Sequence, residues 1–294
     1  MHMIRLRGRL PRMLALGVCF VLLAGCSTAR FGYDWLPALT VWQLERYLAL
    51  DRDQAQETRR RLDTVLDWHR RVELPGYASY LERTARRLET APTVDAAMFE
   101  DWRRRLHDAW LALMPQLAPP LAALALSLRE SQIDRLEQRL AERTQELHAE
   151  YLPLDPGRQV EGRVDRWLDR TEFLFGEASD TQDQTLRRLA GQMPPYERLW
   201  LRERELRVQA LLTLLRRIVR EDPSPAVASR WCEDYLAGLW QSPDPDRQAR
   251  IEEASRHADS ISLVVINQAS DEQRARLLKK MRGYVSDFTL LASR

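Results

Sequence analysis

The sequence predicts an all-α protein behind an N-terminal leader, and three observations support this fold class. Of the 294 residues, 45% are hydrophobic and 30% are charged, which excludes a disordered chain, a collagen-like repeat and a multi-span membrane protein. Beyond residue 36, apolar residues recur at spacings of three and four to the end of the chain. No stretch alternates with period two, and β-branched residues are sparse, so no sheet is expected.

The leader has the form of a signal peptide. Residues 1–12 are basic, and Met13 to Ala24 is an uncharged apolar run that is too short to span a bilayer. It ends in the sequence Leu-Ala-Gly-Cys, which resembles the lipobox of bacterial lipoproteins. That resemblance implies cleavage between Gly25 and Cys26 and acylation of Cys26. An ordinary secretory signal with an incidental cysteine is the alternative.

The lipobox also implies a location. Two or three acyl chains on Cys26 would hold the protein on a membrane, because each buried methylene contributes about 0.8 kcal/mol. Ser27, rather than Asp, follows the cysteine, and in lipoproteins this implies the outer membrane, with the body facing the periplasm. Cys19 leaves with the leader, so Cys232 has no disulfide partner and is either a buried small hydrophobe or a nucleophile, the former being preferred.

Apolar stripes mark the helices in order, and prolines mark the joints. The stripes span residues 62–72, 99–113, 133–151, 160–174, 208–219 and 277–291. The joints are placed at Pro75, Pro92, Pro115, Pro119-Pro120, Pro153 with Pro156, Pro194-Pro195, Pro223 with Pro225, and Pro243 with Pro245. Asp51 and Ser270 are expected N-caps, and Ser127 and Thr181 are expected to open capping boxes. Counting between the joints gives about eleven or twelve helices.

Four parts of the chain are expected. They are a lipoprotein signal peptide (1–25), a lipidated tether (26–36), an N-terminal helical half (37–153) and a C-terminal helical half (154–294). In the tether, Phe31, Tyr33 and Trp35 are expected to dock on the body. The two halves are divided at the Pro153–Gly157 turn, or they form one continuous domain.

The search for chemical motifs assigns no catalytic residue, metal or cofactor. The absence of a G-x-G pair and of a G-x-S-x-G elbow excludes the dinucleotide fingerprint, the P-loop and the hydrolase elbow. His69, His107, His148 and His257 are each separated by more than thirty residues, so no zinc-ligand spacing exists.

The charge balance does not favour nucleic acid as a partner. Four arginines lie in the leader, which leaves 41 basic against 43 acidic residues in the mature chain. Runs such as Arg59-Arg60-Arg61 and Arg103-Arg104-Arg105 are either phosphate binders or solvated faces with ion pairs. The second interpretation is preferred because each run lies among acids, although lipid head groups remain open as partners.

The most distinctive segment is a helical corner. Trp68, His69, Arg70 and Glu73 precede a proline that opens the next helix, and Tyr77 follows it. These five residues are the candidate binding corner. The alternative, which is preferred, is structural: His69 lies on the apolar stripe, where its ring would only satisfy a carbonyl or Glu73.

Several motifs together indicate a family. The lipobox, the Trp42-x-x-x-x-Tyr47-Leu48 helix, the W-H-R-x-x-E-L-P-x-Y corner and the terminal helix from Asp271 to Tyr284 resemble an uncharacterised family of all-helical proteobacterial lipoproteins. This resemblance covers essentially the whole mature chain. It implies fold and location and brings no established activity.

Glutamines in first turns give a second, weaker resemblance. Residues 124–140 and 266–281 echo each other around Gln132 and Gln273, which either duplication or shared helix capping explains. The segment from Ala269 to Gln273 is similar to the LTxxQ elements of Spy-type periplasmic chaperones, although it lacks the Leu-Thr and this chain is longer.

Three functions are weighed from these patterns. The preferred one is a non-catalytic envelope component that binds a protein partner or unfolded chains, for which an exposed apolar groove bordered by arginines is expected. The alternative is binding or sensing of a lipid or other amphiphile in an interhelical cavity of several hundred Å³. A cell-envelope hydrolase using the His69 corner is the least favoured.

Overall fold

The computed structural model describes residues 28–91, 93–152 and 155–294. These residues form eleven α-helices and no strand, which confirms the all-α class. In chain order the helices are α2 (Thr28–Leu48), α3 (Arg52–Val72), α4 (Leu74–Thr90), α5 (Ala96–Ser127), α6 (Glu130–Tyr151), α7 (Pro156–Phe175), α8 (Asp180–Gln192), α9 (Glu197–Glu221), α10 (Pro225–Gly238), α11 (Pro245–Asn267) and α12 (Asp271–Ala292). Gly25 and Cys26 lie outside the described residues, as do Pro92 and Pro153.

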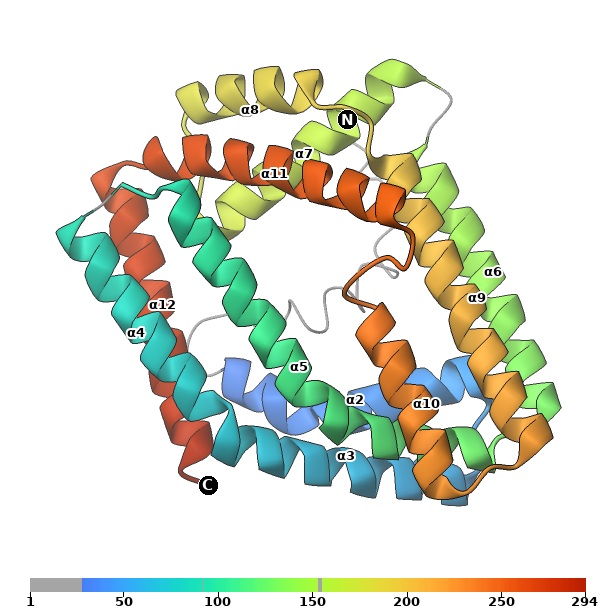
Figure 1. The fold of residues 1–294 in the computed structure, drawn as a ribbon. Helices are drawn as coiled ribbons and strands as arrows, with labels where there is room; N and C mark the ends of the chain where they lie inside the picture. The colour runs from blue at the N-terminus through green and yellow to red at the C-terminus, as the bar shows by residue number, and fades with distance from the viewer. Residues whose placement is uncertain (1–27, 92, 153–154) are drawn as a thin grey trace, which may run out of the picture.

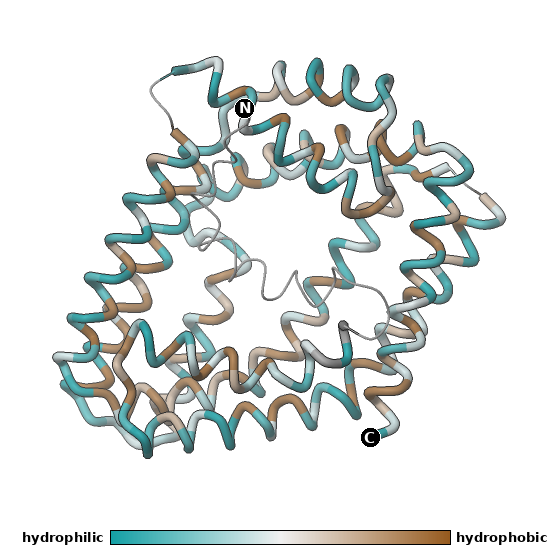
Figure 2. The backbone as a smooth tube through the Cα atoms, turned by 180° about the vertical axis from the view of Figure 1, so that it is seen from behind, coloured by the Kyte–Doolittle hydropathy of each residue, from teal (hydrophilic) through white to brown (hydrophobic). Residues whose placement is uncertain are grey.

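The helices lie along four sides of a quadrilateral (Figure 1), and the view from behind shows the same outline with hydrophobic segments on every side (Figure 2). Helices α4 and α12 form one side, α2 and α3 the next, α6 and α9 the third, and α7, α8 and α11 the fourth. Helix α5 runs from the corner near α11 to the opposite corner, where it packs against α10. On two sides of the quadrilateral, therefore, a helix that precedes residue 153 pairs with a helix that follows it.

The largest core cluster lies where α5 packs against α10, with α6 and α9 beside them. Ala118, Ala122 and Ala125 of α5 are buried in one cluster with Ala228 and Cys232 of α10. Such small side chains allow the two helix axes to approach closely. By length and composition α5 could cross a membrane, but its second half is part of this core.

The prolines confirm some expected joints and correct others. Pro75, Pro156, Pro225 and Pro245 each occupy the first turn of a helix, as expected. The Pro115 and Pro119-Pro120 joints are wrong, because α5 continues through all three prolines. Pro115 and Pro119 are exposed, so water can bond the carbonyls that lose their partners, whereas Ala118 and Ala122 on the adjoining face are buried.

Helix α2 differs from the expected tether. Residues 28–36 are helical and continue into the body, because Tyr33, Pro37 and Val41, spaced by four, form one buried face. Tyr33 docks as expected, whereas Trp35 is 51% exposed on the other side of the helix. The side chain of Phe31 lies outside the described residues.

Two expected caps are confirmed and two are wrong. Asp51 and Ser270 accept hydrogen bonds from the backbone N–H groups of the residues three positions later. Ser127 instead ends α5, and Thr181 lies inside α8, whose cap is Ser179. Ser179 is the better cap because it sits directly before the first helical residue in extended backbone, with Gln182 three positions on.

The echoed glutamines occupy equivalent structural positions. Gln132 Nε2 donates to Gln54 Oε1 at 2.8 Å, and Gln273 Nε2 donates to Gln182 Oε1 at 2.9 Å. Both pairs are buried and each joins the starts of two helices. Each amide also donates to a backbone carbonyl of its partner's region, for example Gln132 to Ala49 and Gln273 to Glu177. The pairs therefore fix helix ends that are distant in sequence.

We expect Gln132→Ala to lower the free energy of unfolding by about 2–4 kcal/mol, because the buried amide of Gln54 would lose its side-chain partner and the carbonyl of Ala49 would lose its donor. Urea unfolding of the mature chain, followed by circular dichroism, measures this change. The matched control is Gln138→Ala on the exposed face of α6, for which about 0.5 kcal/mol or less is expected. Equal effects of the two substitutions would contradict a structural role for the pair.

Candidate functional site

The five corner residues do come together where α3 meets α4. Only Glu73 separates the two helices, and Leu74 is buried below it against Tyr33 of α2 and Leu291 of α12. The Tyr33 hydroxyl lies 2.8 Å from His69 Nδ1, and the two rings stack at 5.9 Å. His69 therefore has a partner from α2, rather than the carbonyl or Glu73 that the sequence suggests.

The other corner residues surround this contact. The ring of Trp68 lies 6.3 Å from His69, and the ring of Tyr77 meets His69 edge-on at 5.5 Å. Arg70 lies over the Tyr33 ring and pairs with Asp34 and Asp67 at the surface. Burial, followed by the charge of Glu73, raises the pKa of Tyr77 to about 12. The corner is thus an aromatic joint between α2, α3 and α4.

An apolar groove lies beside this joint, and it was not identified from the sequence. Its volume is about 470 Å³, and α4, α5, α7 and α12 line it. The lining residues are Tyr77, Tyr80 and Leu81 of α4, Trp102, Arg105, Leu106 and Ala109 of α5, Phe173 and Leu174 of α7, and Leu277, Lys280, Met281, Tyr284 and Phe288 of α12. Tyr77 belongs to both the corner and the groove, since its other edge meets Phe288 at 6.4 Å.

Two cations border the groove. Arg105 lies 5.8 Å over the Tyr77 ring, and Lys280 Nζ lies 3.7 Å over the Phe173 ring and donates to the Phe173 carbonyl. Within the described residues neither forms an ion pair, in contrast to Arg103 and Arg104 nearby. Burial lowers the pKa of Lys280 from its ordinary value of 10.5. Each of these cations therefore borders the groove without a carboxylate partner among the described residues.

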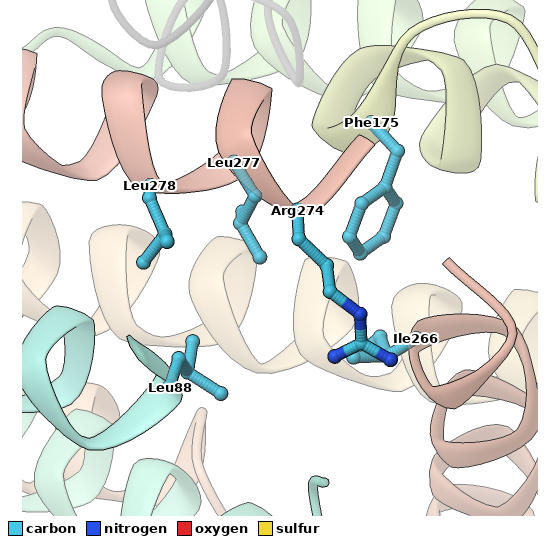
Figure 3. A pocket seen from close by; sticks show the side chains of 6 residues that line it. All are labelled: Leu88, Phe175, Ile266, Arg274, Leu277 and Leu278. Atoms are coloured by element: carbon cyan, nitrogen blue, oxygen red, sulfur yellow. The ribbon is translucent and has the colours of Figure 1, made fainter. Parts of the chain in front are cut away.

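A second, much smaller space lies beside the groove, near the start of α12. Figure 3 shows Arg274, Leu277 and Leu278 of α12 facing Leu88, Ile266 and Phe175 around a second cavity. That cavity is only about 20 Å³, which is room for about one water molecule. Leu277 lines both spaces, so the two adjoin at this side chain.

The groove was missed because its walls have the pattern of core faces. The stripes at 99–113 and 277–291 were expected to pack against other helices. Trp102 and Leu106 from the first, and Tyr284 and Phe288 from the second, line the groove instead. Periodicity identifies an apolar face but not whether another helix covers it. Leu106, 64% exposed at the rim, shows how incomplete the cover is.

The remaining candidates are separate structural contacts. His148 bonds Glu205, His257 bonds Tyr196, and the His107 ring lies 4.9 Å from Trp240. No cluster of three or more metal-ligating side chains occurs in the part of the chain that the structure describes. Cys232 is fully buried, and burial raises the pKa of its thiol to about 11, which favours the structural interpretation.

The arginine runs mostly form solvated ion pairs. Examples are Arg60 and Arg61 with Glu57, Arg104 with Asp101, Arg187 with Asp183, and Arg216 with Asp134 and Glu137. These arginines have acidic partners at the surface, as the preferred interpretation expects.

We expect the free energy of unfolding to fall at acidic pH, because His69 becomes protonated. Burial lowers the pKa of His69 below its ordinary value of 6.5, so the unfolded chain binds the proton more readily than the folded chain. The contribution of neutral His69 to the free energy of unfolding is present in full above pH 6.5 and is lost as the pH falls below this value. Urea unfolding across this range compares the wild type with His69→Gln, whose side-chain amide does not titrate and can donate to or accept from the Tyr33 hydroxyl. Parallel pH curves for the two proteins would contradict the expectation.

Comparison with known proteins gives a family and no activity. No curated protein and no solved structure matches the chain. A family model described as a family of unknown function (DUF6279) matches residues 46–244, which is more than half of the chain. The match runs from the end of α2 to the loop before α11, and it includes the corner and the α4 and α5 walls of the groove. The chain belongs to this uncharacterised family, DUF6279.

Proposed function

We propose that the protein is a non-catalytic, lipid-anchored envelope protein that binds an anionic amphiphile in the groove between α4, α5, α7 and α12. The observation that carries this proposal is the groove itself, an apolar space of about 470 Å³ with two cations at its rim. Ligand pockets are typically about 300–1,000 Å³, mostly apolar, with a few polar groups that orient the ligand.

The lining suits a hydrocarbon chain. Six aromatic side chains and several aliphatic ones face the groove, and burying apolar surface there contributes about 25 cal/mol per Å². Burial raises the pKa of both Tyr77 and Tyr80 to about 12, which agrees with the apolar character of the groove.

The rim suits an anionic head group. Arg105 and Lys280 line the groove from α5 and α12, and a carboxylate or phosphate at either cation would gain charge-assisted hydrogen bonds. An apolar chain in the groove with its head at these cations is therefore the arrangement that the geometry favours. This reverses the preference of the sequence patterns, which favour a protein partner.

A protein partner is the second candidate. The groove is bordered by Arg105, as expected for such a partner, and Leu106 at its rim is 64% exposed. An apolar side chain of an envelope protein, or of an unfolded chain as in Spy-type chaperones, would fit the same space. The small volume of the groove favours one acyl chain over a helix.

The anchor and location complete the proposal. Acylation of Cys26 would hold the body at the outer membrane, on its periplasmic face, where amphiphiles are abundant. Support comes from the leader alone, in the basic start, the apolar run and the Leu-Ala-Gly-Cys ending. No nucleic acid, metal or cofactor is part of the proposal.

We expect cis-parinaric acid, a fluorescent fatty acid, to bind the mature protein at one saturable site. Ala109→Trp, which fills the groove, should weaken binding by about tenfold or more. Lys280→Met should weaken binding of oleic acid, measured by displacement, by about tenfold, while leaving its methyl ester nearly unchanged, because only the acid carries the charge.

Two matched controls localise this effect. Leu111→Trp places the same indole side chain on the exposed side of α5, and Lys279→Met removes the neighbouring exposed cation of α12; neither residue lines the groove. Equal losses in test and control variants would contradict binding in the groove. If no fatty acid binds and a photoreactive residue at position 106 captures one envelope protein, the second candidate is favoured.

We expect radiolabelled palmitate to be incorporated into the protein in growing cells, and Cys26→Ala to abolish the label and leave the leader uncleaved. The reason is that lipobox processing requires the thiol of Cys26 as the acyl acceptor. Cys232→Ala, which changes a buried thiol, should keep the label. Palmitate incorporation that survives Cys26→Ala would contradict the anchor.

A further inference from the structure

Helix α2 presents an apolar stripe to solvent. Trp35, Leu39 and Trp42 are 51%, 50% and 52% exposed, and the guanidinium of Arg46 lies 4.9 Å over the Trp42 ring. At 3.6 residues per turn, these four positions fall within about 60° of one another around the helix. Exposed apolar residues gathered on one face mark an interaction surface.

The fold uses the opposite side of the same helix. Tyr33, Val41 and Leu48 are buried, and their positions lie about half a turn from the stripe. Tyr33 also bonds His69 of α3, and Leu48 belongs to the largest core cluster. Docking of α2 on the body therefore rests on one face, and the stripe lies on the other, exposed face.

The stripe lies close to the expected anchor. Helix α2 begins at Thr28, two residues after Cys26, so acyl chains on Cys26 would hold its first turn at a bilayer surface. With a rise of 1.5 Å per residue, the stripe covers about 10–21 Å of α2 from its first residue. We propose that the Trp35–Leu39–Trp42 face of α2 lies on the membrane surface, with the helix parallel to the bilayer plane. This proposal rests on the anchor at Cys26 and not on the groove.

The composition of the stripe fits a lipid surface. Tryptophan is enriched at membrane–water interfaces, where an amphipathic ring is partly wet, and an amphipathic helix binds there through its apolar face. Arg46, at the far end of the stripe, would meet anionic head groups. The one acid adjoining the start of the stripe, Asp34, pairs with Arg70 and Arg294.

The test places a fluorophore on the stripe of the mature lipoprotein in vesicles of phosphatidylethanolamine and phosphatidylglycerol. Leu39→Cys can be labelled selectively with nitrobenzoxadiazole, because Cys232 is fully buried and Cys26 carries acyl chains. We expect spin-labelled phospholipid to quench this label and aqueous iodide to leave it unquenched. The control is Leu111→Cys, similarly exposed on α5, where iodide should quench and the phospholipid should not.

A second measurement separates the stripe from the anchor. The chain that begins at Ser27 carries no acyl chains, and Trp35→Ser, Leu39→Ser and Trp42→Ser together should lower its partitioning onto the same vesicles by about tenfold. Parinaric acid binding should be unchanged in this triple variant. Equal partitioning with and without the stripe overturns the proposal, and so does a label at position 39 that is shielded from iodide but not quenched by lipid. If the protein is not acylated but its partitioning onto vesicles still depends on the stripe, only the anchor at Cys26 is overturned.

Discussion

The side-chain amides of Gln54 and Gln132 are buried and form hydrogen bonds with each other. Those of Gln182 and Gln273 form the same arrangement elsewhere in the fold. Each glutamine caps its own helix with its carbonyl and uses its amide protons for a partner helix and a backbone carbonyl. A buried amide without partners costs about 1–3 kcal/mol, so each pair is stable only when all four helix ends are in register. The frame of helices depends on these two joints.

The second joint explains why a groove persists beside α12. The start of α12 is fixed through Gln273, and its last turns are fixed by Leu291, buried against Tyr33, and by the ion pair of Asp287 with Arg30 at 3.0 Å. Because both ends are held and α12 also packs along α4 and against α7, its middle does not close onto α5. An apolar face held apart in this way retains a space that ordinary core packing would close.

The fold was largely predictable from the sequence and the site was only partly so. Periodicity gave the helices, and Asp51 and Ser270 were recognisable caps because capping is local. The pairing of Gln54 with Gln132 spans 78 residues and that of Gln182 with Gln273 spans 91, and no local pattern encodes such distances. The prolines of α5 failed as joints because tertiary burial outweighed local preference. The groove could not be located from the sequence, because apolar residues have the same spacing on a helix face whether or not another helix covers it.

The corner now has a physical role that follows from its neighbours. A line of aromatic contacts runs from Tyr33 of α2 through His69 and Tyr77 to Phe288 of α12, with successive ring centroids 5.9, 5.5 and 6.4 Å apart. The first ring belongs to the helix that we propose lies on the membrane, and the last two line the groove that we propose holds an amphiphile. Rings packed in contact resist relative displacement of the helices that carry them. If both proposals hold, the ring of His69, packed between Tyr33 and Tyr77, would help to fix the orientation of the groove relative to the bilayer.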